Sequence, residues 1–379
     1  MPKFESILDQ AVEKEFSLEQ VDNAVLALRD FLELKPEERV GLLKDADSNK
    51  KTFAILKEAL DKIGCSYQEL LVDDETKAND LEEITKNSDL LISVSMHDTT
   101  DEIYEDEYFK KYKYRLLALL DADPDVFNNG GAMTEKREDL EHRLNKMENT
   151  LDKARGFKIT SSYGTNLEVG LRRFAERRWY KDSGVINAPG KWDNLPGGEI
   201  FTTPDERTVN GILVLPALDS GIAPDQGVDE LVRIHIKEGV ITAIEGGQSA
   251  EKLRKCLEKD MRLEKKEKEN PFDVLRIAEI SFGANTKARS KVADPEQSYK
   301  ALGISTIEAE KRFGTMHLAF GSSAHGEAGT EGFEDAGSHY DFVIPRNGLT
   351  VEMFTDEKDF DRKKNGRKII EEGTIKFFD

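Results

Sequence analysis

The stretch that decides the fold of the first part of this chain is residues 38–72, ERVGLLKDADSNKKTFAILKEALDKIGCSYQELLV. Glu38 to Leu43 (ERVGLL) predicts a strand. Asn49 to Ile63 has helical periodicity and stops before Gly64, a residue type that often ends a helix. Tyr67 to Val72 predicts a second strand. This β-α-β order predicts a parallel or mixed sheet with flanking helices.

The same alternation continues on both sides of that stretch. Glu19 to Leu34 has the periodicity of a helix, and the runs Asp89 to Ser95 and Arg115 to Leu120 predict buried strands. Thr134 to Ala154 is a long charged segment with one apolar seam, which is typical of a helix that packs on a domain or joins two. We therefore predict an α/β N-terminal domain over residues 1–155.

The composition changes after Gly156. Gly, Thr and short β-like runs dominate from there onward, with a hairpin turn at residues 237–239 and one helix from about Ala250 to Lys268. A chain of 379 residues has room for two domains. The second is predicted to be an α+β, mainly β-sheet, metal-binding domain over residues 156–379.

The charge balance narrows the classes of partner. The chain has 55 Lys and Arg against 75 Asp and Glu, a formal net charge of −20 at pH 7. This balance disfavours binding to nucleic acid and to an anionic membrane surface. No apolar run approaches the ~18 residues of a membrane span, and the N-terminus lacks the apolar centre of a signal peptide. We therefore expect a cytoplasmic protein with no nucleic acid and no membrane as partner.

Histidines and an aspartate lie in strand-like runs near the C-terminus. His339 and Asp341 are two residues apart, so a strand places both side chains on one face. His317 shares its face with Thr315 and Ala319, whose small side chains leave room beside the ring. Imidazole and carboxylate suit Zn²⁺, Mn²⁺, Co²⁺ or Fe²⁺. A structural His–Asp hydrogen bond and a core histidine explain the same residues equally well.

Three glutamates are candidates, two of them because their neighbours are apolar. Glu279 interrupts an apolar run, and Glu199 begins a strand-like run after two glycines. A carboxylate in a buried strand is costly unless it is paired or bound to a metal. Glu310 lies seven residues before His317 and can approach it only if the chain bends at Gly314.

Five segments of the chain carry motifs in a recognisable order. They are GTNLEVGL (Gly164 to Leu171), NLPGGEIFTTP (Asn194 to Pro204), AEISFG (Ala278 to Gly283), EKRFGTMHLAFG (Glu310 to Gly321) and SHYDFVI (Ser338 to Ile344). Together they resemble the aminopeptidase T/aminopeptidase S family, the thermophilic metallo-aminopeptidases. The resemblance covers residues 156–379, whereas the first 150 residues fit only by length and α/β pattern.

This resemblance implies a dinuclear site with two Zn, Co or Mn ions. The ligands that it implies are Glu199, Glu279, His317, His339 and Asp341, with Glu310 as a looser match. Glu199 or Glu279 would act as general base or bridging ligand. Two divalent cations would neutralise the four carboxylates, which would otherwise repel one another and raise one another's pKa values.

One position departs from the aminopeptidase pattern. The family has a catalytic Tyr seven residues after its first His, where this chain has Ala324 with His325 beside it. A tyrosine O–H can stabilise a tetrahedral oxyanion and an alanine cannot. His325 is therefore the candidate for that catalytic role, unless the peptidase activity is weak or lost.

Three functions are compatible with these residues. The preferred one is a metallo-aminopeptidase that hydrolyses the N-terminal bond of a peptide or amino-acid amide with a metal-bridged water, as a homodimer like the family. The second is a mononuclear iron dioxygenase, because a ring-cleaving dihydroxypyridine dioxygenase shares this fold. That group has a His where this chain has Glu279 and no acid at the position of Glu199, so both glutamates favour the hydrolase. The third is a metallohydrolase for another amide, or a degenerate binding protein.

Overall fold

The chain forms two compact units in the computed structural model. The structure describes residues 16–95, 100, 103–104, 106–171, 177–218, 228–264, 271–290, 304–323 and 336–378. Unit 1 draws on residues 1–141, 182–198 and 285–288, and unit 2 draws on 142–181, 199–284 and 289–379. Each unit is therefore built from three separate stretches of the chain, which alternate along the sequence. Residue 155, the predicted end of the first domain, lies inside the first stretch of unit 2. The predicted α/β part followed by a mainly β part is confirmed.

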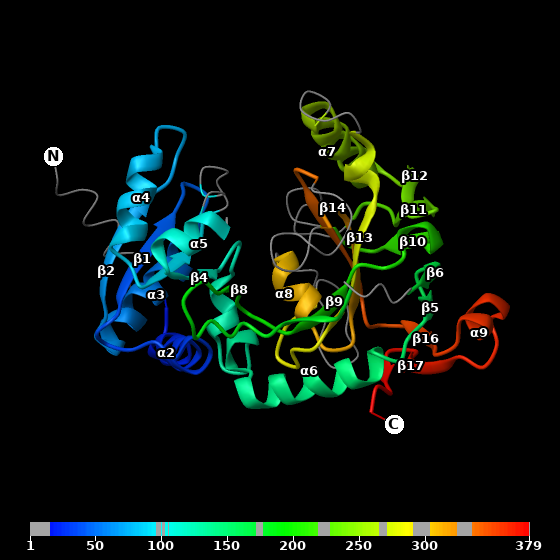
Figure 1. Ribbon diagram of the computed structural model, residues 1–379, viewed down its shortest axis with the longest axis horizontal. Helices are drawn as coiled ribbons and strands as arrows, with labels where there is room; N and C mark the ends of the chain where they lie inside the picture. The colour runs from blue at the N-terminus through cyan, green and yellow to red at the C-terminus, as the bar shows by residue number, and fades with distance from the viewer. Residues whose placement is uncertain are drawn as a thin grey trace. The chain divides into compact units, whose positions relative to one another are not determined.

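Unit 1 is built on a five-stranded parallel sheet of order β2-β1-β3-β4-β8 (Figure 1). Its strands are β1 (Arg39–Lys44), β2 (Ser66–Leu71), β3 (Leu90–Ser93), β4 (Arg115–Ala118) and β8 (Trp192–Asn194). Its helices are α2 (Leu18–Leu32), α3 (Lys50–Ile63), α4 (Ala78–Lys86) and α5 (Asp106–Tyr112), with 3₁₀ turns η2 (Pro124–Phe127) and η3 (Ala132–Thr134). Strands β3 and β4 are buried along their whole length, as their apolar runs predict.

The β-α-β stretch folds as its residues predict. The Asn49 side chain caps α3 by accepting hydrogen bonds from the backbone N–H groups of Lys51 and Thr52. The helix ends at Gly64, whose φ of 94° lies in the left-handed region that glycine tolerates best. Apolar residues of α4 and α5, Leu81 and Phe109 among them, pack with β1, β3 and β4 in one buried cluster.

The boundary between the units falls within α6 (Arg137–Leu151). The apolar seam predicted for this segment is buried at all four positions, Leu140, Leu144, Met147 and Leu151. The remaining face of α6 is mainly charged and exposed, as the periodicity requires.

Unit 2 contains two β-sheets. The larger has the antiparallel order β12-β11-β10-β6-β5-β16-β17-β18, and the smaller has the order β15-β14-β13-β9-β7. The larger comprises β5 (Gly156–Thr160), β6 (Asn166–Gly170), β10 (Asn210–Leu215), β11 (Val232–Lys237), β12 (Val240–Glu245), β16 (Thr350–Phe354), β17 (Arg367–Glu371) and β18 (Thr374–Ile375). The smaller comprises β7 (Tyr180–Asp182), β9 (Glu199–Thr202), β13 (Ile277–Gly283), β14 (Met316–Gly321) and β15 (His339–Ile344).

Aromatic side chains hold the two sheets of unit 2 together. The ring of Phe157 on β5 lies 5.5 Å from that of Phe282 on β13, between centroids, and Phe377 lies 5.4 Å from Phe282. All three are at most 1% exposed. Because side chains alternate along a strand, Phe282 on the core face leaves Glu279 and Ser281 of β13 on the opposite face.

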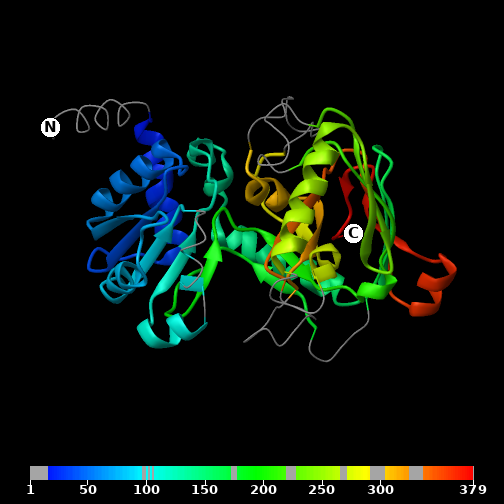
Figure 2. The ribbon, with the colours of Figure 1, turned by 90° about the horizontal axis from the view of Figure 1, so that it is seen from above.

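The helices of unit 2 are α7 (Gln248–Glu264), α8 (Thr306–Lys311) and α9 (Glu357–Arg362), with 3₁₀ turns η4 (Glu206–Thr208) and η5 (Pro271–Leu275). Helix α7 lies against β11 and β12, as Figure 2 shows. The predicted hairpin joins these two strands, with positive φ at Glu238 and Gly239.

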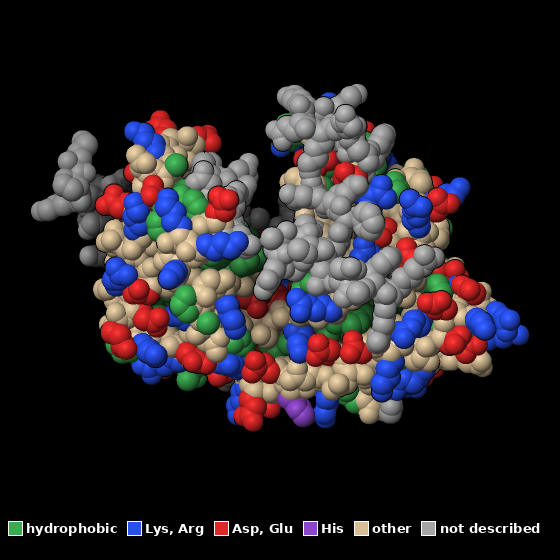
Figure 3. Space-filling view, in the orientation of Figure 1, with side chains coloured by type: hydrophobic (Ala, Val, Ile, Leu, Met, Phe, Trp, Pro, Cys, Tyr) green, Lys and Arg blue, Asp and Glu red, His purple; other side chains and the backbone are tan. Residues whose placement is uncertain are grey.

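The described surface mixes both signs of charge. Figure 3 shows acidic and basic side chains interspersed over the visible face of the described residues. Among the described helices, none combines the length and apolar character needed to cross a membrane.

Candidate metal centre

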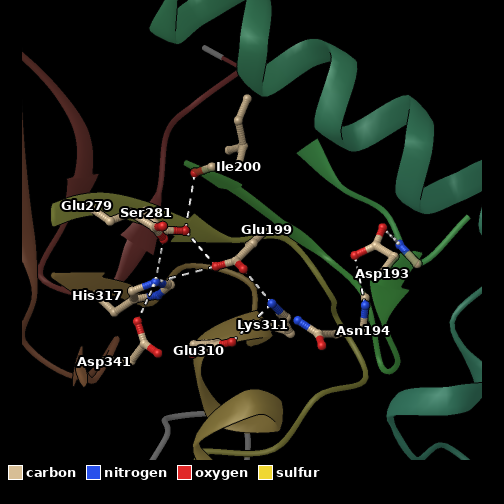
Figure 4. A network of polar contacts seen from close by, with 12 residues as sticks. Asp193, Asn194, Glu199, Ile200, Glu279, Ser281, Glu310, Lys311, His317 and Asp341 are labelled. Carbon is tan, nitrogen blue, oxygen red and sulfur yellow. Dashed lines mark hydrogen bonds and ion pairs between the residues drawn. The ribbon is translucent and has the colours of Figure 1, made fainter. Parts of the chain in front are cut away.

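Four neighbouring strands of the smaller sheet place polar side chains on one face. Residues paired directly across neighbouring strands point to the same side of a sheet. The pairs that matter are Asp341 with Ala319, His339 with Gly321, Ser281 with His317, and Glu199 with Gly283. The shared face therefore carries Glu199, Glu279, Ser281, His317, His339 and Asp341. Figure 4 shows the carboxylates of Glu199, Glu279 and Asp341 directed at the ring of His317.

Helix α8 adds two more charged side chains to this face. Glu310 and Lys311 form its last turn, and both are buried. The chain then turns back at Gly314, whose φ is 89°, before entering β14. This is the bend that Glu310 needs in order to approach His317.

Two contacts hold α8 in place. The Ser305 hydroxyl accepts a hydrogen bond from the backbone N–H of Glu308, which caps the helix. The fully buried Glu308 carboxylate accepts hydrogen bonds from Arg289 Nε at 2.9 Å and Nη2 at 2.7 Å. Such a fork-shaped pair fixes orientation as well as distance.

Close packing between α8 and β13 depends on Gly283. A Cβ at this position would lie 2.2 Å from the Arg312 carbonyl oxygen and 2.5 Å from that of Glu310. Both are backbone atoms, which cannot rotate aside. We expect Gly283→Ala to lower the free energy of unfolding by about 1–3 kcal/mol through overpacking. Denaturant unfolding followed by circular dichroism measures the change.

Gly337→Ala is the matched control for that variant. Its Cβ would have Glu264 Oε1 as its nearest neighbour, at 3.8 Å, which is ordinary van der Waals contact. Equal stability of the two variants would show that α8 can move away from β13 without cost, and that Gly283 does not position Glu310.

His317 is the centre of the site. Its Nε2 lies 2.9 Å from Glu279 Oε1, 3.5 Å from Glu199 Oε2 and 3.5 Å from Asp341 Oδ1. The ring is 1% exposed. Three carboxylates from three strands therefore converge on one nitrogen atom, a position that favours a cation.

His339 lies at the more open edge of the site. Its side chain is 35% exposed, and Nε2 lies 3.3 Å from Asp341 Oδ1. Its Nδ1 lies 2.8 Å from the backbone oxygen of Ser322, which can only accept, so Nδ1 donates a hydrogen bond there. A hydrogen bond of this kind orients the other nitrogen, as it does in metal-ligating histidines.

The charges of the cluster shift the pKa values of its members. Burial disfavours the charged ring of His317, but Glu199, Glu279 and the other carboxylates outweigh it and raise its pKa to about 10. Burial raises the pKa of Glu310 to about 8; Asp341 and Glu199 add to this effect and Lys311 opposes it. Without a metal, His317 therefore holds a proton at neutral pH, in the middle of the carboxylates.

The donor atoms fit a metal ion. Two groups in the described residues bring three ligand atoms within 4.8 Å of one another: Glu199, Glu279 and His317, and also Glu310, His317 and Asp341. His317 Nδ1 and Glu310 Oε2 are buried and make no hydrogen bond. A cluster of imidazole and carboxylate with an unused buried oxygen is chemically suited to a divalent cation. The site can therefore hold metal, which is the coarser part of what the sequence predicts.

The two groups of three together contain five of the six predicted ligands, namely Glu199, Glu279, Glu310, His317 and Asp341. His339 lies outside both groups, in contact with Asp341. His325 lies outside the described residues, as does Ala324. Sequence reasoning missed two participants. Ser281 donates a hydrogen bond to Glu199 Oε2 at 2.7 Å, and Lys311 forms ion pairs with Glu199 and Glu310. The register of β13 could have identified Ser281, but nothing distinguishes Lys311 in sequence from an exposed lysine.

A family model and a curated relative that match this chain carry the same description. The family model described as NicX, 2,5-dihydroxypyridine 5,6-dioxygenase, matches residues 27–353. The 2,5-dihydroxypyridine 5,6-dioxygenase of Pseudomonas putida KT2440 is 33% identical over 152 residues. That aligned stretch covers 40% of this chain and 40% of the curated relative.

Two solved structures share the fold. The structure of 2,5-dihydroxypyridine dioxygenase from Pseudomonas putida KT2440 matches with a TM-score of 0.64 at 19% identity, over 94% of this chain and 96% of that one. Wild-type AmpT from Thermus thermophilus matches with a TM-score of 0.58 at 15% identity, over 94% and 98%. At these identities the likeness concerns the fold alone.

The family match overturns the assignment to the aminopeptidases. The prediction of a metallo-aminopeptidase, a hydrolase acting on peptides, is wrong. The physical reason is that both solved structures have the same fold, so motifs that build its sheets do not separate hydrolase from dioxygenase. The family match also covers most of the first 150 residues, which fitted the aminopeptidases only by length and pattern.

Proposed function

The chain belongs to the 2,5-dihydroxypyridine 5,6-dioxygenase family, and from this membership we propose that it is a ring-cleaving dioxygenase that uses one iron ion and O₂. The proposed substrate class is a dihydroxylated nitrogen-containing aromatic ring. The observation that carries the proposal is the family match over residues 27–353. This replaces the two Zn, Co or Mn ions expected from the aminopeptidase resemblance with a single ion of iron.

The proposed iron ligands are His317, His339 and Asp341. Asp341 Oδ1 lies 3.5 Å from His317 Nε2 and 3.3 Å from His339 Nε2, so this carboxylate connects the two imidazoles. Two histidines and a carboxylate are the ligand set of many non-haem Fe²⁺ oxygenases. His317 would supply the second imidazole, because its Nε2 lies 3.5 Å from Asp341 Oδ1. When bound, iron supplies the one-electron chemistry that lets O₂ react with an aromatic ring.

The remaining side chains would orient those ligands and handle protons. Glu279 Oε1 lies 2.9 Å from His317 Nε2 and can accept the proton that leaves this nitrogen when a metal binds. Ser322 holds Nδ1 of His339 and so keeps Nε2 directed at Asp341. The exposed edge at His339 is the side from which a ring could reach the site.

Oxygen uptake tests this proposal. Protein loaded anaerobically with Fe²⁺ and given 2,5-dihydroxypyridine is expected to consume one O₂ per substrate and to bleach the ring absorbance. The same protein without O₂ or without iron is expected to leave the ring intact. A panel of aminoacyl amides, with Zn²⁺, Co²⁺ or Mn²⁺, is expected to remain uncleaved.

The opposite pattern would overturn the proposal. Hydrolysis of amides without oxygen uptake would return the chain to the hydrolases, and failure on every dihydroxylated ring tested would reject the substrate class. The homodimer expected from the sequence stays a prediction, which light scattering of the purified protein decides.

A further inference from the structure

Lys311 is a fully buried lysine inside an acidic cluster. Its side chain is 0% exposed, and Nζ lies 3.0 Å from Glu310 Oε1 and also forms an ion pair with Glu199 Oε1. Burying an ammonium group is costly, and replacing such ion pairs by apolar side chains is often neutral or stabilising. We therefore look for a role of Lys311 other than stabilising the fold.

Glu199 links this lysine to the proposed iron ligands. One of its carboxylate oxygens pairs with Lys311, while the other lies 3.5 Å from His317 Nε2 and accepts a hydrogen bond from Ser281. Figure 4 shows Glu199 between the two nitrogen-bearing side chains. A carboxylate that spans two cations is the usual bridge of a two-metal site. Here Lys311 supplies the positive charge on one side of Glu199, and the ring of His317 lies on the other side.

The charge balance of the metal centre depends on this lysine. Glu199, Glu279, Glu310 and Asp341 carry four negative charges when ionised. With Lys311, one divalent cation leaves the site with a net charge of −1 and two leave it with +1. Two divalent cations balance the four carboxylates only when the Lys311 ammonium group is absent. A second metal bound at Glu199 Oε1 or Glu310 Oε1 would have to displace the Lys311 ammonium group from that oxygen.

We propose that the Lys311 ammonium group occupies the place of a second cation and so restricts this centre to a single metal ion. It is a positioning residue, since it acts through Glu199 and Glu310 and not on the substrate. The inference rests on the proposed function only for the identity of the single ion as iron. The claim that Lys311 limits the centre to one metal ion per chain concerns the number of ions alone.

The metal count of four proteins tests this inference, with Mn²⁺ as the probe. Wild type, Lys311→Met, Lys311→Met/Glu310→Gln and Lys181→Met are dialysed against excess Mn²⁺, and bound metal is measured by elemental mass spectrometry. Electron paramagnetic resonance reports whether two bound ions are magnetically coupled. Lys181 is the control because it pairs with Glu148 at 2.6 Å but is about one-third exposed, outside the cluster.

We expect one Mn²⁺ per chain in wild type and Lys181→Met. Lys311→Met is expected to bind two Mn²⁺ ions with a coupled spectrum, because the Glu199 and Glu310 carboxylates lose the ammonium group that pairs with them. The double variant keeps the net charge of wild type and is expected to return to one ion.

Each other outcome contradicts the inference. Lys311→Met that binds only one ion would show that the lysine does not exclude a second metal. Lys311→Met that stays unfolded even in excess Mn²⁺ would show that no metal can take its place. Two ions in wild type would overturn both this inference and the single-iron proposal, whereas one ion without ring cleavage would overturn the proposed function alone.

Discussion

Replacing His317 by Ala is expected to abolish metal binding and to lower ring cleavage by more than ~100-fold. The loss of residues that merely orient metal ligands already costs about 10–100-fold in affinity or activity, and His317 contacts three carboxylates at once. Without its ring, the nitrogen at the centre of the site is gone. Iron content by elemental mass spectrometry and the initial rate of oxygen uptake measure the two effects.

His142→Ala provides the control for this substitution. His142 lies on the exposed face of α6, where its removal is expected to change iron content and rate little. Circular dichroism on both variants verifies that the fold is retained. A His317→Ala protein that is folded and binds iron as tightly as wild type would exclude His317 as a ligand.

Replacing Arg289 by Met is expected to have the largest effect on stability. It leaves the Glu308 carboxylate fully buried without the fork of hydrogen bonds from Arg289 Nε and Nη2. Breaking a buried pair by removing one partner costs about 3–5 kcal/mol of unfolding free energy. Because α8 carries Glu310 and Lys311, we also expect the variant to bind metal more weakly. Denaturant unfolding and metal titration measure the two changes.

Arg262→Met is the matched control for Arg289→Met. Arg262 pairs with Glu258 at 3.3 Å on the surface of α7, with side chains 78% and 59% exposed. Exposed pairs of this kind contribute about 0–1 kcal/mol. Similar losses in the two variants would mean that the buried pair has no special role in holding α8.

The sequence accounts for much of the fold because its signals are local. The helix from Lys50 to Ile63 is specified by the periodicity of its own apolar residues, by the Asn49 cap and by Gly64. The buried seam of α6 follows from the spacing of four apolar residues. Such patterns depend on neighbours within a few residues and can be interpreted without tertiary contacts.

The candidate site could be predicted only in part. Strand alternation alone placed His339 and Asp341 on one face, and the apolar neighbours of Glu279 indicated that its carboxylate is buried. The choice between two metals and one was not available from these residues. The motifs that carry them belong to a fold shared by a dioxygenase and an aminopeptidase.

By itself, the sequence determined an α/β unit followed by a β-rich unit and a set of acids and histidines suited to a metal ion. Only the tertiary structure decided which charges meet. Lys311 is next to Glu310 in the chain but 112 residues from Glu199, and the ion pair between Lys311 and Glu199 exists because β9 and α8 flank the same strand, β13. Electrostatic energy depends on distance in space and on burial, neither of which a linear sequence displays.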